Sequence, residues 1–145
     1  MKPVFFDSNI LVYAHNGQSP FFLQAKSLQE KVVWGKLLAA IAPQNLLEFY
    51  STVTNKNKFE KPLTFLEAKK ACQIYLTSGF LIIYPKQNDI EAVFSLAAKR
   101  KIIGRRIFDV YLVVTMLSNG IKTIYTANER DFEIFREIKV VNPFK

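Results

Sequence analysis

The chain has 145 residues with 50% hydrophobic content, enough to bury one core, so we expect a single domain spanning residues 1–145. The formal net charge of +8 favours an anionic partner such as nucleic acid, although basic proteins without that role are common. A single cysteine, Cys72, excludes an internal disulfide, and no apolar run approaches the roughly 18 residues of a membrane span, so we expect a soluble cytoplasmic protein with no membrane partner.

Apolar runs of strand length alternate with segments of helical period, a pattern that predicts an α/β fold on a largely parallel sheet. The expected strands span residues 3–6, 38–42, 80–84, 123–125 and 139–141. The first expected helix begins at residue 8, and four more span residues 20–32, 44–53, 65–78 and 90–100. A further helix carries Asp109 in its first turn and ends at residue 119, and a short one covers residues 129–135. No linker, internal repeat or low-complexity stretch interrupts this alternation.

Three helix starts carry recognisable capping residues. Ser19 is placed to cap a helix whose first position is Pro20. Thr64 and Glu67 have the spacing of a capping box, and Asn88 is placed to cap the helix that follows it. These residues predict where the three helices begin.

The connection at residues 55–62 is polar and basic, which makes it the best candidate for a mobile segment. Its lysines, Lys56, Lys58 and Lys61, could contact phosphates, but a solvated run of charge is the favoured interpretation. Phe59 among them could stack on a base, although such an aromatic more often anchors its loop to the body of the protein.

Four carboxylates lie at the ends of apolar stretches or just inside them. Asp7 follows the first strand, Glu48 lies on the helix after the second, and Asp131 follows the fourth. Asp109 is the only charge in residues 107–117, where an unpaired carboxylate would cost several kcal/mol or be forced to protonate. All four can reach the carboxyl edge of one parallel sheet, which is where α/β folds bind ligands.

Such a cluster of acids predicts a metal centre. Like charges brought together cannot all stay ionised without a counter-ion, and ligands that are all oxygen suit Mg²⁺ or Mn²⁺. A metal held in this way activates water and stabilises the charge that develops on a phosphate. A basic protein with an acidic metal pocket therefore suggests phosphodiester hydrolysis.

The segments that carry the acids resemble the motifs of PIN-domain nucleases. Residues 5–14, FFDSNILVYA, are similar to the opening motif, in which an apolar strand delivers an aspartate followed by a small hydroxyl residue and Asn. Residues 43–49 resemble the second motif, residues 104–109 the third, residues 125–132 the fourth, and residues 140–143 the closing strand. The match is in order and spans nearly the whole chain.

The resemblance is strongest to the single-domain toxin nucleases of VapBC-type toxin–antitoxin pairs. It implies a PIN-like three-layer sandwich, with a central, mostly parallel five-stranded sheet flanked by helices. It also implies an endoribonuclease that uses Mg²⁺ or Mn²⁺, with RNA as substrate, a cognate antitoxin as partner and a homodimer as the working form. Carried over by position, Asp7, Glu48 and Asp109 are the core metal-binding acids and Asp131 is the fourth.

The fourth motif leaves two positions open for its acid. Family members place that acid either where this chain has Asn128 or where it has Asp131. An amide oxygen coordinates without bringing charge, so Asp131 is favoured, and Asn128 is expected to contact metal-bound water or substrate. Ser8, Asn9 and Thr126 are expected to make contacts of the same kind.

Two arginines lie within one turn of Asp109. Arg105 and Arg106 are placed to hold an RNA phosphate, and this is the favoured role. The alternative is that they neutralise the acids or are merely solvated.

Each acid also has a simpler explanation. Asp7 could be a helix N-cap, Asp109 and Asp131 could be first-turn charges that gain from the helix dipole, and Glu48 could belong to a solvated helix face. The four motifs together favour the nuclease. A phosphatase with an aspartyl nucleophile would need a second acid where Asn9 stands, so the remaining alternative is an inactive PIN-fold module that binds RNA or protein.

Overall fold

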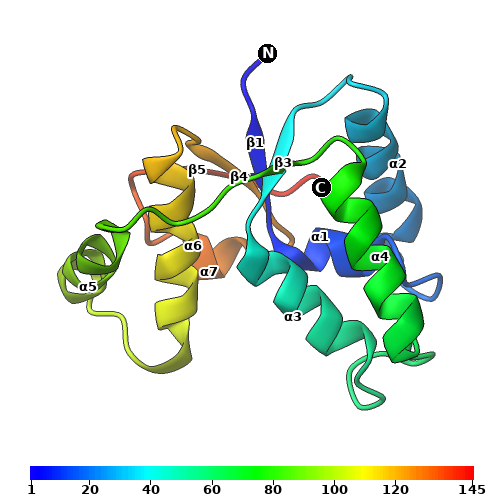
Figure 1. Ribbon diagram of the computed structural model, residues 1–145. Helices are drawn as coiled ribbons and strands as arrows, with labels where there is room; N and C mark the ends of the chain where they lie inside the picture. Colours follow the sequence, from blue (N-terminus) through cyan, green and yellow to red (C-terminus); the bar gives the residue numbers. More distant parts are fainter.

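The computed structural model describes residues 1–145 and has a five-stranded sheet between two layers of helices (Figure 1). The strands are β1 (Val4–Phe6), β2 (Ala39–Ile41), β3 (Leu81–Ile82), β4 (Thr123–Tyr125) and β5 (Lys139–Val141). All neighbouring pairs are parallel, and the order across the sheet is β3-β2-β1-β4-β5. The expected α/β sandwich is therefore confirmed, with β1 at the centre of the sheet.

Helices cover both faces of the sheet. They are α1 (Ser8–Tyr13), α2 (Phe22–Val33), α3 (Pro43–Val53), α4 (Phe65–Thr77), α5 (Asp89–Arg100), the 3₁₀ turn η1 (Gly104–Arg106), α6 (Ile107–Ser118) and α7 (Glu129–Phe132). Helices α1 to α4 pack on one face and α5 to α7 on the other, to the right and left of the sheet in Figure 1. No helix is long and apolar enough to traverse a bilayer.

The alternation of side chains along β1 explains why both faces must be covered. Phe5 packs into the core beneath α5 to α7, whereas Phe6 packs into the core beneath α1 to α4. Both side chains are fully buried. A strand that is apolar on both sides belongs in the middle of a parallel sheet, which is where β1 lies.

The helix starts follow the sequence only in part. The capping box is confirmed: Thr64 Oγ1 accepts from the backbone N–H of Glu67, whose carboxylate accepts from the N–H of Thr64. The predicted start at Pro20 is wrong, because the chain makes a turn there and α2 begins at Phe22. In this turn Ser19 Oγ accepts from the N–H of the residue before α2.

Two further boundaries differ from the prediction. The side chain of Asn88 makes no capping hydrogen bond; instead the carboxylate of Asp89 accepts from the N–H of Lys86 at 2.8 Å and closes the turn before α5. The last helix ends at Phe132 rather than at residue 135, because the chain must turn back at once to place β5 beside β4. Phe135 is nevertheless buried in the core.

The loop after α3 is anchored by one aromatic side chain. Phe59 is only 5% exposed and belongs to the core beneath α1 to α4. The interpretation of Phe59 as an anchor is therefore confirmed, whereas a stacking role would need an accessible ring. The lysines on either side, Lys58 and Lys61, are exposed.

The register of the central strands brings two polar residues together. Phe5 pairs with Ile124 and Phe6 with Tyr125. Just after these pairs, the N–H of Asp7 donates to the carbonyl of Tyr125 at 3.0 Å. Asp7 and Thr126 therefore leave the carboxyl edge of the sheet side by side. This edge is where the candidate functional residues collect.

Candidate active site

Asp7 is the most firmly held of the four acids. It is the N-cap residue of α1, and its Oδ1 accepts from the N–H of Ser8 at 2.8 Å. Its Oδ2 accepts from the hydroxyl of Thr126 at 2.7 Å and from the amide of Asn9 at 3.2 Å. The capping explanation and the site explanation are thus compatible, because the cap fixes the direction in which this buried carboxylate points.

Glu48 is half-buried, and both of its carboxylate oxygens accept hydrogen bonds. Its Oε1 accepts from the hydroxyl of Ser8 at 2.6 Å, and its Oε2 accepts from the amide of Gln44 at 3.4 Å. The first bond joins α3 to the start of α1, so the second acid lies beside the first. Glu48 therefore lies on the polar face of α3 and is also held against the start of α1.

Asn45 supports this contact and was not singled out from the sequence. Its amide donates to Ser8 Oγ at 3.1 Å, while its own oxygen accepts from the N–H of Ala42 at 2.7 Å. The side chain is fully buried, so both ends of the amide are satisfied inside the protein. An Asn four residues after the end of β2, at the third position of a helix that begins with Pro43, was the available indication.

Asp109 and Asp131 approach from the other side of the sheet, and Arg106 lies between them. Its Nη2 donates to the backbone carbonyl of Asp131 at 2.8 Å, and its Nε lies 4.0 Å from Asp109 Oδ2. This arginine therefore joins the start of α6 to α7 and offsets negative charge there. Of the two interpretations of Arg106, the contact with the acids is the one found; Arg105 is exposed and makes no ion pair.

Burial and neighbouring acids act on Asp7 and Asp109. Burial raises the pKa of Asp7 to about 6 against the hydrogen bonds from Thr126 and Ser8, and the charges of Glu48 and Asp131 raise it further. Burial, followed by the charges of Asp131 and Asp7, raises the pKa of Asp109 to about 7, although Arg106 opposes the shift. Negative charge is in excess at this edge of the sheet.

The acids are not drawn tightly around a common point. No group of three His, Cys, Asp or Glu side chains has the spacing of a ready-made metal site. The assignment of Asp7, Glu48, Asp109 and Asp131 as metal ligands stays a prediction.

The two candidates in the fourth motif face the same space. Asn128 and Asp131 both line a polar hollow of about 530 Å³ at the carboxyl edge. The backbone N–H of Asn128 donates to Thr126 Oγ1 at 3.0 Å. The side chain of Asn128 is exposed, so its amide group can contact a ligand. The choice between these two residues also stays a prediction.

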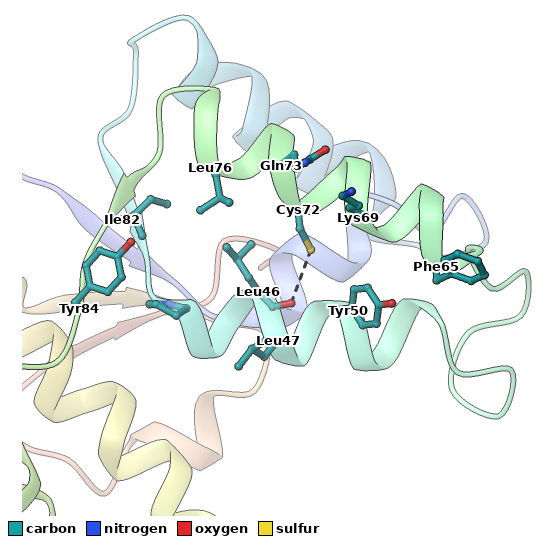
Figure 2. Close-up of a pocket in the computed structure, with 11 residues that line it drawn as sticks. Leu46, Leu47, Tyr50, Phe65, Lys69, Cys72, Gln73, Leu76, Ile82 and Tyr84 are labelled. Carbon is teal, nitrogen blue, oxygen red and sulfur yellow. Dashed lines mark hydrogen bonds between the residues drawn. The ribbon is translucent and has the colours of Figure 1, made fainter.

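A larger, apolar cavity lies elsewhere, between α3 and α4. It has a volume of about 650 Å³ and eight of its 11 lining residues are hydrophobic. Figure 2 shows Leu46 and Tyr50 of α3 facing Cys72 and Leu76 of α4 across it. We refer to this cavity as the apolar groove; none of the four acids lines it.

Comparisons with known proteins agree with the motifs. The PIN domain family matches residues 4–139. Ribonuclease VapC24 of Mycobacterium tuberculosis is 28% identical over 137 residues, which cover 94% of each chain.

Solved structures extend the likeness to the fold. VapC20 of M. tuberculosis, described as a toxin that cleaves the sarcin–ricin loop, has a TM-score of 0.68 at 13% identity over 91% of this chain and 95% of that one. A toxin–antitoxin complex from Klebsiella pneumoniae has a TM-score of 0.65 at 20% identity and covers 98% of both chains. At these identities the likeness concerns the architecture.

Proposed function

The chain belongs to the PIN domain family, and on that basis we propose that it is a metal-dependent endoribonuclease, the toxin of a type II toxin–antitoxin pair. The observation that carries this proposal is the convergence of carboxylates from distant parts of the chain: Ser8 binds both Glu48 and Asp7, and burial followed by the charges of the three other acids raises the pKa of Asp109. The name of its relative, Ribonuclease VapC24, supports the same activity. The alternative is a catalytically inactive PIN-fold module that binds RNA or protein, and the presence of all four acids disfavours it.

The donor set fits a hard divalent cation. Asp7, Glu48, Asp109 and Asp131 offer only oxygen ligands. Burial, and after it the charges of the other acids, raises the pKa of Asp7 and Asp109, and a bound cation would favour the ionised form of both. These four residues would hold Mg²⁺ or Mn²⁺. When bound, such an ion activates water and stabilises charge on a phosphate in an in-line displacement.

The remaining residues of the proposed site have separate tasks. Ser8 and Thr126 donate hydrogen bonds that fix the orientations of Glu48 and Asp7. Asn9 bridges these strand ends, because its amide lies within 3.3 Å of the Thr126 hydroxyl and 3.2 Å of Asp7. We expect Ser8, Asn9 and Asn128 to contact substrate at the reacting phosphate. Thr126 is fully buried and its hydroxyl is bonded to Asp7, so the predicted contact of Thr126 with substrate is wrong and this residue orients Asp7 instead.

The two arginines are assigned different roles. Arg105 is exposed and free of ion pairs, which fits a contact with an RNA phosphate. Arg106 is held by Asp131 and Asp109, so it positions these acids, and any contact with phosphate is secondary.

The proposed partners are RNA, a cognate antitoxin and a second copy of the chain, and the proposed location is the cytoplasm. An antitoxin tail would cover the apolar groove and place a basic side chain near Asp7, Glu48 and Asp109. Because linkage is reciprocal, Mg²⁺ added at fixed ionic strength should then weaken antitoxin binding. If antitoxin affinity does not depend on Mg²⁺, the tail inhibits by blocking the access of RNA to the site.

Sedimentation of the free protein tests the homodimer. A strictly monomeric protein would contradict it.

Cleavage of RNA by the purified protein tests the proposed activity. Labelled RNA should be cut in the presence of Mg²⁺ or Mn²⁺ and remain intact with a chelator. The Asp109→Asn variant, prepared in the same way, controls for contaminating nuclease. Affinity for RNA without cleavage under any metal condition would establish the binding module instead.

A further inference from the structure

A second polar hollow opens beside Glu48 and is distinct from the one at Asp131. Its volume is about 410 Å³, within the roughly 300–1,000 Å³ range of small-molecule sites. Its lining includes Glu48, Ser51, Thr52, Lys58, Arg105 and Phe108. A proposed catalytic acid is thus one wall of a space that also holds hydroxyls, two cations and an aromatic ring.

Phe108 is the one large hydrophobic side chain of α6 that is exposed. Leu112 and Met116 of the same helix are at most 2% exposed, whereas Phe108 is 55% exposed and directly precedes Asp109. The start of the helix is fixed here, since the amide of Gln44 donates to the carbonyl of Phe108 at 3.2 Å. An exposed ring on a fixed backbone next to an acid has the properties of a base-stacking platform.

The two cations reach the hollow from separate segments. Arg105 comes from η1, directly after Gly104, whose φ of +63° gives the chain the turn that places it. Lys58 comes from the loop after α3, where the buried ring of the next residue, Phe59, anchors the backbone. Neither cation forms an ion pair with a carboxylate, so both are free to contact a phosphate.

We propose that this hollow is a subsite for one unpaired nucleotide of the RNA, next to the bond that is cut, with its base on Phe108 and its phosphate between Lys58 and Arg105. The inference rests on the proposed ribonuclease function and specifies its substrate. The hydroxyls of Ser51 and Thr52 are within the same hollow and supply hydrogen bonds to the ribose or to a base edge. A base in a duplex is stacked between its neighbours, so the substrate must be single-stranded or looped at this position.

A stacking assay with a short RNA tests the subsite. The probe is a single-stranded oligonucleotide with one 2-aminopurine, a base whose fluorescence falls on stacking, and the protein carries Asp109→Asn so that the probe stays intact. Adding Phe108→Ala should remove the quenching and weaken binding by about 5- to 100-fold, whereas Phe108→Tyr should retain both. Phe94→Ala is the matched control, because Phe94 is another exposed ring, 61% exposed, on α5.

The cations are tested by salt dependence. Lys58→Ala and Arg105→Ala should each flatten the plot of log affinity against log salt by about 0.7 for a single strand. Lys69→Ala is the control, since Lys69 lines the apolar groove. An unchanged slope in both subsite variants would overturn the phosphate contacts.

The outcomes separate this inference from the proposed function. If wild-type protein cuts RNA and Phe108→Ala behaves like Phe94→Ala in quenching and affinity, the subsite is overturned and the nuclease stands. If no RNA is cut but quenching depends on Phe108, the subsite stands and the nuclease is lost. If Phe108→Ala alters only the oligomeric state in sedimentation, the ring contacts protein, and the subsite is again overturned.

Discussion

Two cavities share α3 as a wall, and Leu47 lines both of them. On one side is the apolar groove, faced by Leu46 and Tyr50 (Figure 2). On the other is the polar hollow, faced by Glu48 and Ser51. One helix of 11 residues thus presents two exposed surfaces of opposite chemistry in addition to the face that it buries.

The difference predicts how each surface binds. Binding in the apolar groove should depend on the area buried and little on salt. Binding at the acids and the polar hollow should depend steeply on salt and on divalent cations. Variants on the two sides of α3 should therefore separate two activities of the protein, and the following five tests examine that separation.

The largest effect is expected from Asp109→Asn, which removes a charge from the proposed metal site and preserves its shape. RNA cleavage should fall by at least about 1,000-fold, because several kcal/mol of metal-dependent stabilisation is lost. A metal-supplemented cleavage assay measures this. Turnover at the wild-type rate would refute the role of Asp109.

The same variant has a signature in stability that depends on pH. The pKa of Asp109 is raised from 3.8 to about 7 in the folded state, so its contribution to the free energy of unfolding is full below pH 4 and is lost as the pH rises through 7. Without metal, Asp109→Asn should be more stable than wild type at pH 8 by on the order of 1–2 kcal/mol, allowing for solvent screening, and equally stable near pH 4. Denaturant unfolding at both pH values, with Mg²⁺ added as a control that should restore wild-type stability, checks this.

The next effect concerns the fourth acid. Asp131→Asn should reduce metal affinity and cleavage by about 10- to 100-fold, whereas Asn128→Ala should change them only a few-fold, because only Asp131 brings charge to the cation. Calorimetric metal titration of both variants measures the difference. The reverse order would make Asn128 the principal ligand of this motif.

A smaller effect is expected where Arg106 joins α6 to α7. Arg106→Ala should weaken metal binding about tenfold, since Asp131 loses a hydrogen bond to its backbone and Asp109 loses its counter-ion. Arg105→Ala is the matched control and should leave metal affinity unchanged. If the two variants have equal metal affinities and lose RNA binding equally, Arg106 contacts an RNA phosphate, as Arg105 is proposed to do, and does not position the acids.

The smallest effect on cleavage is expected in the apolar groove. Leu76→Glu places a charge among the apolar side chains there, and Leu76 is already 49% exposed, so the fold should tolerate it. The RNA cleavage rate should stay within about twofold of wild type, while affinity for an antitoxin tail should fall about tenfold or more. Leu23→Glu, on α2 and 77% exposed, controls for the added charge. A large loss of cleavage would show that the two sides of α3 are coupled.

The sequence was sufficient to predict the elements and the topology class. Residues 123–125 and 139–141 were predicted as strands with their observed bounds, because short β-branched runs between turn residues leave little choice. Boundaries failed where tertiary contacts decided them. The start of α2 is displaced because the ring of Phe21 stacks on Phe144 at 4.7 Å and approaches Tyr13 at 5.2 Å, so the turn before the helix is part of the core packing.

The candidate site was predictable only as a set of acids. Their apolar surroundings and the PIN-like motifs singled out Asp7, Glu48, Asp109 and Asp131. The contact between Arg106 and Asp131 joins residues 25 positions apart, so it depends on how α7 packs against α6 and has no local sequence pattern. The exposure of Phe108 was equally hidden, because a nearly continuous apolar helix gives no clear period to distinguish its outer face.

The strand order β3-β2-β1-β4-β5 also bears on when the protein becomes active during its own synthesis. The first strand made, β1, has one unpaired edge until β4 has been translated. Only after that can Asp7 accept the hydrogen bond from the Thr126 hydroxyl. A nascent chain that has emerged as far as β3 carries Asp7 and Glu48 but neither of the other two acids. The proposed nuclease should therefore be inert while it is attached to its own message through most of elongation. A ribosome-arrested chain that ends at Gly120 lacks β4, Thr126 and Asp131. Such chains should leave added RNA intact in Mg²⁺, and cleavage by them would contradict this timing.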